Sequence, residues 1–145
     1  MRHRRILCAL DFSAPSEAAL KVAEELAQRF GAELVVAHVV EPVLAPAAYG
    51  PLPTTVAQVR VEAESAARDR LGEIVSEISA RGVRATSVLE SGPAADTLVE
   101  IVKARKIDLV VIATHGLTGI EHALLGSVAE RVVRLCPCPV LTIKG

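Results

Sequence analysis

The chain has 145 residues, the usual length of one domain, and a formal net charge of −1 from 16 Lys and Arg against 17 Asp and Glu. This balance argues against a nucleic-acid-binding protein, which usually carries a strongly basic face. No apolar segment approaches the roughly 18 residues of a membrane span. The apolar run behind Arg2–Arg5 stops at Asp11, well short of a signal-peptide core. We therefore expect one cytoplasmic domain over residues 1–145, with reduced cysteines.

Strand-like apolar runs and helix-like periodicity alternate along the chain. A strand is predicted over Arg5–Leu10, followed by a helix that Ser13 caps, with Pro15 in its first turn and Gly31 at its end. Four prolines and a glycine in residues 41–53 exclude a regular element there. Further strands are predicted over 34–40, 83–90, 108–113 and 139–144, and further helices from Thr54 or Thr55 to about Arg81, after Ser91–Pro93, and from Ser127 to about Leu135. The inward face of the second helix is predicted to hold Ala63, Ala67, Leu71, Ile74, Val75 and Ile78.

Five strands alternating with four helices predict a three-layer, doubly wound α/β fold with a parallel five-stranded sheet of order 3-2-1-4-5. In such sheets a ligand binds beyond the carboxyl ends of the strands, where the winding direction reverses. That point lies between the first and fourth strands. Asp11 follows the first strand and a glycine-containing loop follows the fourth, so both are expected at one crevice.

The stretch 113–130 has the general form of an anion-binding segment, because a buried strand leads through a loop with three glycines to a helix. Gly116, Gly119 and Gly126 allow positive φ and close backbone approach, and Ser127-Val-Ala-Glu130 has the spacing of a capping box. The N–H groups of Ser127 and Val128 would then face a phosphate. The loop contains no Lys or Arg and is not a Walker A motif, so phosphates would be held by neutral donors, a helix end and a divalent ion. The alternative is that the glycines only serve the turn and Ser127 only caps its helix.

Asp11 is the candidate ligand for ribose hydroxyls or for Mg²⁺. Its alternative role is a turn-forming Asp ahead of Ser13. Val39 could offer backbone groups to an adenine edge, and His115 could contact phosphate or act as a base. For His115, His38 and His122, a structural or surface role is the alternative we favour.

The three cysteines fall into two groups. Cys8 lies in the first strand pattern and is expected in the core. Cys136 and Cys138 are separated by one proline and lack the second pair that a metal site needs. We interpret this pair as structural, with redox sensing as the alternative.

Four segments together resemble the universal stress protein family over nearly the whole chain: Arg5–Ser13, His38–Pro42, Ala113–Glu130 and Cys138–Leu141. The resemblance implies the adenine nucleotide α-hydrolase-like fold. The family's ATP-binding branch carries G-x2-G-x9-G-[ST], which falls here on Ala113, Gly116, Gly126 and Ser127. Ala113 thus replaces the first glycine, and a positive φ there would be unfavourable. Leu117 stands where many binding members have a basic residue.

The resemblance also implies a ligand, a partner and a function. The ligands would be ATP and Mg²⁺, with Asp11 as the possible metal ligand, and the family commonly dimerises through its last strand, here Val140, Leu141, Thr142 and Ile143. We therefore predict a cytoplasmic, dimeric stress-response protein that binds ATP and acts as a sensor or regulator, with no nucleic-acid or membrane partner. The alternatives are a nucleotide-free interaction module of the same family and a slow ATPase. The residues implied at the nucleotide are Ala9, Leu10, Asp11, Ser13, Val39, Ala113, His115, Gly116, Gly126, Ser127 and Val128.

Overall fold

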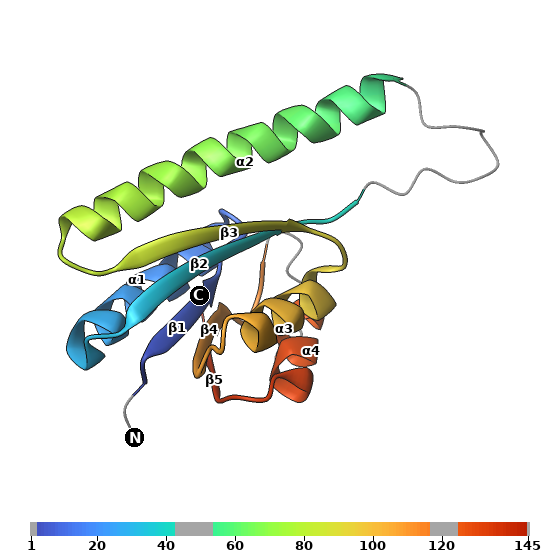
Figure 1. Cartoon of the computed structure of the whole chain (residues 1–145). Coiled ribbons are helices and arrows are strands. Elements are labelled where there is room, and N and C mark those ends of the chain that lie inside the picture. Colours follow the sequence, from blue (N-terminus) through green and yellow to red (C-terminus); the bar gives the residue numbers. More distant parts are fainter. Residues whose placement is uncertain (1–2, 43–53, 117–124, 145) are drawn as a thin grey trace.

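The computed structural model describes residues 3–42, 54–116 and 125–144, with side chains from residue 57 onward in the second of these segments. Strands and helices alternate along the chain (Figure 1). The elements in chain order are β1 (Arg5–Ala9), α1 (Ala14–Phe30), β2 (Glu33–Val40), α2 (Thr54–Ala80), β3 (Ala85–Ser91), α3 (Ala94–Ala104), β4 (Leu109–Ala113), α4 (Ser127–Leu135) and β5 (Val140–Ile143). The predicted strand boundaries differ from these by one or two residues.

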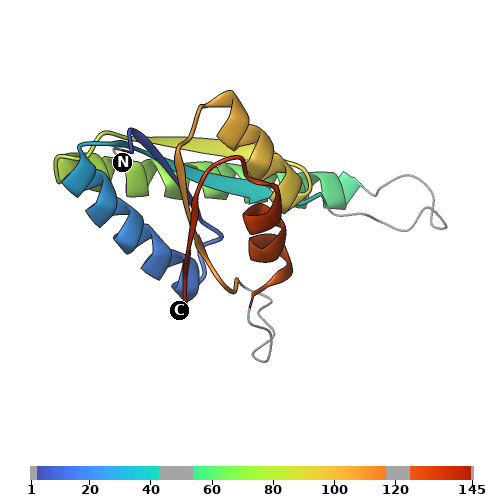
Figure 2. The same ribbon diagram turned by 90° about the horizontal axis from the view of Figure 1, so that it is seen from below.

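The five strands form one parallel sheet of order β3-β2-β1-β4-β5, as predicted. Helices cover both faces, and the views in Figures 1 and 2 place α1 on the opposite side of the sheet from α3 and α4. β3 and β5 are the two edge strands. The doubly wound fold class expected from the order of elements is therefore confirmed.

The central strands are buried on both faces, so neighbouring residues of one strand enter different cores. In β1, Cys8 packs with α1 and α2, whereas Leu7 packs with α3 and α4. In β4, Val111 and Val110 divide in the same way. This explains why these strands read as continuous apolar runs instead of alternating patterns.

The ends of α1 are formed as the sequence predicts. The Ser13 hydroxyl accepts a hydrogen bond from the Ser16 N–H at 3.3 Å, and Pro15 stands in the first turn. At the other end, Gly31 adopts the left-handed conformation with φ 63°, and its N–H bonds to the last turn. These caps fix where the chain enters α1 after β1, which positions the residues of the crevice.

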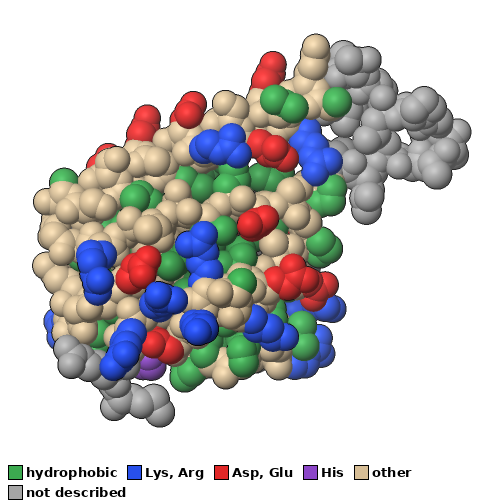
Figure 3. Space-filling model, viewed as in Figure 1, with side chains coloured by type: hydrophobic (Ala, Val, Ile, Leu, Met, Phe, Trp, Pro, Cys, Tyr) green, Lys and Arg blue, Asp and Glu red, His purple; other side chains and the backbone are tan. Residues whose placement is uncertain are grey.

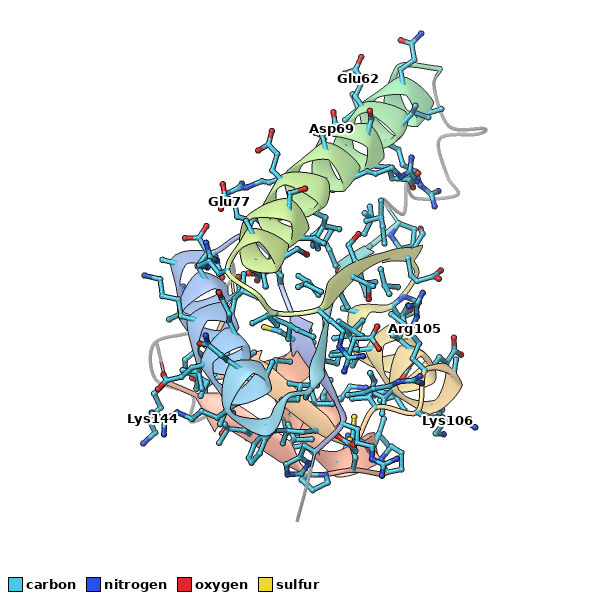
Figure 4. All side chains as sticks on the ribbon, turned by 60° about the vertical axis from the view of Figure 1, so that its left-hand side comes forward. Glu62, Asp69, Glu77, Arg105, Lys106 and Lys144 are labelled. Carbon is cyan, nitrogen blue, oxygen red and sulfur yellow. The ribbon has the colours of Figure 1, made fainter. Side chains whose placement is uncertain are left out.

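α2 is longer than the sheet that it covers, and its first part projects past the strands (Figure 1). Ala63 was predicted to face inward but is exposed, whereas Ala67, Leu71 and Ile78 are buried as expected. The apolar periodicity simply continues beyond the edge of the sheet. Asp and Glu side chains project along the outer side of the helix (Figure 3), and Glu62, Asp69 and Glu77 lie on the side away from the strands (Figure 4). In the described part of the chain, no helix is long and apolar enough to cross a membrane.

Candidate functional site

The crevice forms where β1 and β4 end, because the chain leaves these neighbouring strands toward opposite faces of the sheet. β1 leads into α1, and β4 leads toward α4. Asp11 and Gly116 meet in the gap. A Cβ atom built on Gly116 would collide with Oδ2 of Asp11. The two predicted signals, an acid after the first strand and a glycine after the fourth, therefore do come together.

The Asp11 carboxylate is held in place by the start of α1. Its Oδ1 accepts hydrogen bonds from the Ser13 N–H at 3.0 Å and from the Ser13 hydroxyl. The Asp11 N–H in turn donates to the Ser16 hydroxyl at 3.3 Å. The turn-forming role of Asp11 is thus real, but it does not exclude a ligand role, since the same turn directs Oδ2 toward Gly116.

Phe12 adopts an unexpected conformation beside the crevice. Its φ of 65° lies in the left-handed region, which is uncommon for residues other than glycine. The Phe12 ring packs against His38 with centroids 4.7 Å apart, and the guanidinium of Arg70 lies 4.6 Å above it. These contacts compensate the strained backbone at the exit of β1. They also bring an arginine of α2 to a site whose own loop has none.

His38 has a structural role, as favoured from the sequence. Its Nδ1 hydrogen-bonds to the Leu10 carbonyl at 2.7 Å, and the Leu10 N–H donates to the Ala37 carbonyl at 2.8 Å. Leu10 is 2% exposed. Both backbone groups of Leu10 are therefore engaged with β2, and Leu10 contributes packing to the crevice wall.

The Val39 backbone points toward the crevice. Odd-numbered residues of β2 direct their N–H and C=O groups toward β1, as the bonds of Glu33 to Arg4 and of Leu10 to Ala37 show. The last paired residues of β1 and β2 are Ala9 and Ala37. Val39 lies beyond this point, so its backbone groups face the space that β1 has left, where the sequence placed an adenine edge.

Gly116 and Gly126 lie on the β4 and α4 side of the crevice. They allow other groups to approach the backbone closely, and neither has a positive φ. Gly126 has φ −67° and Gly116 is not among the positive-φ glycines, which corrects the expectation for both. The Gly126 N–H donates to the Thr114 carbonyl at 2.6 Å, and a Cβ at position 126 would stand 3.0 Å from that oxygen. Ala113 is buried in extended β4 and is not among the residues with a positive φ. Alanine can therefore replace a glycine here without backbone strain.

The predicted capping box at α4 is wrong. The N-cap is Gly126, and Ser127 is the first helical residue. Glu130 pairs with Arg134 at 3.4 Å, and its N–H bonds to the Gly126 carbonyl at 2.9 Å. The alternative that Ser127 only caps its helix is therefore excluded. Within the described residues its hydroxyl has no hydrogen bond, and the N–H groups of Ser127, Val128 and Ala129 have no acceptor within the helix.

His115 carries an unsatisfied polar atom beside the crevice. Its Nδ1 is buried and has no hydrogen-bond partner among the residues that the structure describes, and the ring lies near Gly126. Buried polar groups normally have a hydrogen-bond partner. A buried polar atom without one, at a crevice, is typical of a group that hydrogen-bonds to a ligand. Leu117, Gly119 and His122, for which the sequence raised roles, lie outside the described residues.

The donor set fits an anionic ligand with a divalent ion. The start of α4 offers backbone N–H groups and the positive end of a helix dipole, roughly half an elementary charge. On the opposite wall Asp11 offers carboxylate oxygens, which Mg²⁺ prefers. Among the described residues, no group of three or more His, Cys, Asp and Glu side chains is placed to hold a metal ion. A metal here would thus be shared between Asp11 and the ligand's own oxygens.

A family model described as the universal stress protein family matches residues 2–144. The chain belongs to the universal stress protein family. The universal stress protein MJ0531 of Methanocaldococcus jannaschii is 33% identical over 144 residues, which cover 98% of this chain and 82% of that protein. Universal stress protein A homolog 1 of Coxiella burnetii is 33% identical over 145 residues, covering 99% and 97%. These relatives confirm the resemblance seen in the sequence.

Solved structures of the family share the fold. The universal stress protein UspA from Lactobacillus plantarum superimposes with a TM-score of 0.88 at 23% identity, over 99% of both chains. A universal stress protein solved in complex with cAMP has a TM-score of 0.73 at 24% identity, covering 99% of this chain and 98% of that one. The Archaeoglobus fulgidus protein solved with dAMP has a TM-score of 0.66 at 23% identity, covering 99% and 100%. At these identities the likeness concerns the fold.

Proposed function

We propose that this universal stress protein binds ATP together with Mg²⁺ in the crevice between the ends of β1 and β4, and acts in the cytoplasm as a dimeric sensor or regulator of the stress response. One observation carries the proposal. Asp11 meets Gly116 where β1 and β4 end, Gly126 at the N-terminus of α4 lies beside His115, and the buried Nδ1 of His115 has no partner among the described residues. Family members of the same fold that were solved with cAMP and dAMP support an adenine nucleotide.

In this proposal each wall takes one part of the nucleotide. The adenine edge lies against the Val39 backbone beyond the last rung of β1 and β2. The ribose and a magnesium ion lie at Asp11, and the phosphates at the N–H groups of Ser127 and Val128. Gly116 and Gly126 leave room for this approach because each lacks the Cβ that would fill it. Ala9, Ser13 and Ala113, near the ends of β1 and β4, would lie beneath the nucleotide.

We propose that β5 forms the dimer interface. It is an edge strand with one unpaired side, and Leu141 is 39% exposed on it. An exposed apolar edge strand invites pairing with another strand, and a second copy related by a two-fold axis would cover it. β5 pairs with β4, which ends at the crevice, so the dimer would hold two nucleotides on one continuous sheet.

Calorimetry with ATP, with and without Mg²⁺, tests the nucleotide proposal on the purified protein. We expect binding that weakens when Mg²⁺ is withheld. Asp11→Asn is the informative variant, since an amide oxygen can still accept from Ser13 and keep the turn into α1 while the charge is lost. It should lose the Mg²⁺ dependence and remain folded.

Two other results would lead to the alternative functions. The absence of heat at millimolar nucleotide, with the protein folded by circular dichroism, would contradict nucleotide binding and leave an interaction module. Phosphate release that depends on Asp11, measured over hours against Asp11→Ala, would instead indicate a slow ATPase.

A further inference from the structure

The short connection between α4 and β5 carries two cysteines at the end of the sheet opposite to the crevice. α4 ends at Leu135 and β5 begins at Val140, so Cys136 and Cys138 lie in between. Asp108, which directly precedes β4, lies at the same end of the sheet. The C-terminal part of α3 lies at the same end, where Arg105 and Lys106 project (Figure 4). The pair thus belongs to the amino ends of the strands, whereas the nucleotide crevice lies at their carboxyl ends.

The two thiols lie on the same side of the connection, since both side chains pack against one core. Both side chains are partly buried against the core formed by α3 and α4, and both retain some exposure to solvent. Cys8, by contrast, is 0% exposed in the centre of the sheet. The thiols of Cys136 and Cys138 are therefore neighbours with some access to solvent, whereas the thiol of Cys8 has none.

The backbone around the pair is restrained at both ends. The Cys136 N–H bonds to the Val132 carbonyl at 2.9 Å, and the Pro139 carbonyl accepts from the Val110 N–H at 3.0 Å. Pro137 fixes φ within the connection, and the chain bends there. Little backbone freedom remains to be lost when the sulfurs are joined, because both ends of this short connection are already fixed.

We propose that Cys136 and Cys138 form a reversible dithiol–disulfide pair that exchanges with low-molecular-weight disulfides such as oxidised glutathione. The Cys138 thiolate attacks one sulfur of the small disulfide, forms a mixed disulfide and releases one thiolate. Cys136, after losing its proton to solvent, attacks the Cys138 sulfur and releases the second. The balance is two protein thiols and one small disulfide giving one protein disulfide and two small thiols, with two electrons passing from the protein.

The surroundings of the two thiols make their exchange with small disulfides slow at neutral pH. Burial raises the pKa of Cys136 to about 11 and also raises the pKa of Cys138, and Asp108 acts on Cys138 in the same direction. Lys103 acts on Cys136 in the opposite direction. Only a small fraction of either thiol is ionised at neutral pH, so exchange should become faster as pH rises. The site requires no nucleotide and stands independently of the proposed function.

Trypsin separates the cysteine pair from Cys8, so the oxidation state of each can be measured by itself. Trypsin cleaves after Arg134 and Lys144, so one peptide, 135–144, contains both cysteines of the pair, while Cys8 falls in the peptide 6–21. The native protein is equilibrated in glutathione buffers of increasing oxidation, alkylated, digested and weighed by mass spectrometry. We expect peptide 135–144 to lose both alkyl labels and two hydrogens as the buffer becomes oxidising, and to regain the thiols when reduced glutathione is restored. Cys8 should be labelled only after denaturation.

Single variants separate the steps. Cys136→Ser and Cys138→Ser should each leave a glutathione adduct on the remaining cysteine, whereas Cys8→Ala should behave like the parent protein. Full labelling of peptide 135–144 in every buffer would overturn the proposal. So would a persistent glutathione adduct on the unaltered protein, or a covalent link between two chains, because each would show that Cys136 and Cys138 do not close on one another.

Discussion

The carboxylate of Asp11 lies against Gly116 so closely that position 116 has no room for a side chain. The two residues come from opposite ends of the sequence and meet because β1 and β4 are neighbours in the sheet. Asp11 cannot easily withdraw, since Ser13 holds its other oxygen through two hydrogen bonds.

Gly116→Ala should therefore displace the Asp11 carboxylate and weaken ATP binding. Loss of a charge-assisted hydrogen bond costs about 1.5–3 kcal/mol, so the dissociation constant should rise roughly tenfold to a hundredfold. Calorimetry on the variant measures this directly. An unchanged dissociation constant would show that the nucleotide does not lie at Asp11.

Gly72→Ala is the matched control. Gly72 is exposed within α2, and a Cβ there would meet nothing within 4 Å. Alanine at a helix interior is about 0.5–1 kcal/mol better than glycine. The variant should unfold at higher urea concentration and bind ATP like the parent. A loss of affinity here would mean that adding a methyl group has effects unrelated to the crevice.

His115→Phe removes Nδ1, which has no partner in the described part of the chain, and keeps a ring of similar size. Because a buried unsatisfied nitrogen destabilises the ligand-free protein by about 1 kcal/mol, this variant should be at least as stable as the parent. Its ATP affinity should fall. Urea unfolding and calorimetry on the same preparation give both values. A less stable variant with full affinity would assign His115 to the fold instead of the ligand.

Leu141→Lys should convert a dimer into a monomer, because a charge would enter the pairing edge of β5. Ser87→Lys places the same charge on an exposed position of β3, the other edge strand, and should leave the dimer intact. Sedimentation velocity distinguishes the two. A monomeric parent protein, or equal effects of both variants, would contradict an interface at β5.

Cys8 should make the protein sensitive to alkaline pH. Burial raises the pKa of its thiol from the ordinary 9.0 to about 12, so the unfolded chain loses this proton at lower pH than the folded one. The contribution of the protonated Cys8 thiol to the free energy of unfolding is complete below pH 9. It is lost as pH rises toward 12, with a slope of up to about 1.4 kcal/mol per pH unit. Urea unfolding at stepped pH should show a shallower decline for Cys8→Ala. The slope is the readout, since the variant also leaves a small cavity; parallel slopes would contradict the prediction.

The arrangement of the sheet could be predicted because its strands are buried on both sides. Leu7 and Cys8 enter different cores, so both had to be apolar, and the same holds for Val110 and Val111. Continuous apolar runs separated by amphipathic helices then leave few topologies. The meeting of Asp11 and Gly116 followed from strand order alone.

Details that depend on tertiary contacts could not be predicted in this way. Gly126 took the N-cap of α4 because its N–H bonds to Thr114, a contact that no local motif reveals. Phe12 entered the left-handed region with support from His38 and Arg70, which are distant in sequence. Ala63 follows the helical period but lies beyond the sheet, whose extent the periodicity of α2 does not record.

The departure of β1 and β4 toward opposite faces has a consequence for how such a protein changes in evolution. The gap between them is a product of chain path, so it exists whatever side chains border it. A ligand can then be gained or given up through single substitutions at the rim, such as a methyl group at position 116, without disturbing the core that Leu7 and Cys8 help to build. The fold is then conserved, while single residues at the edge of the crevice decide which ligand it binds.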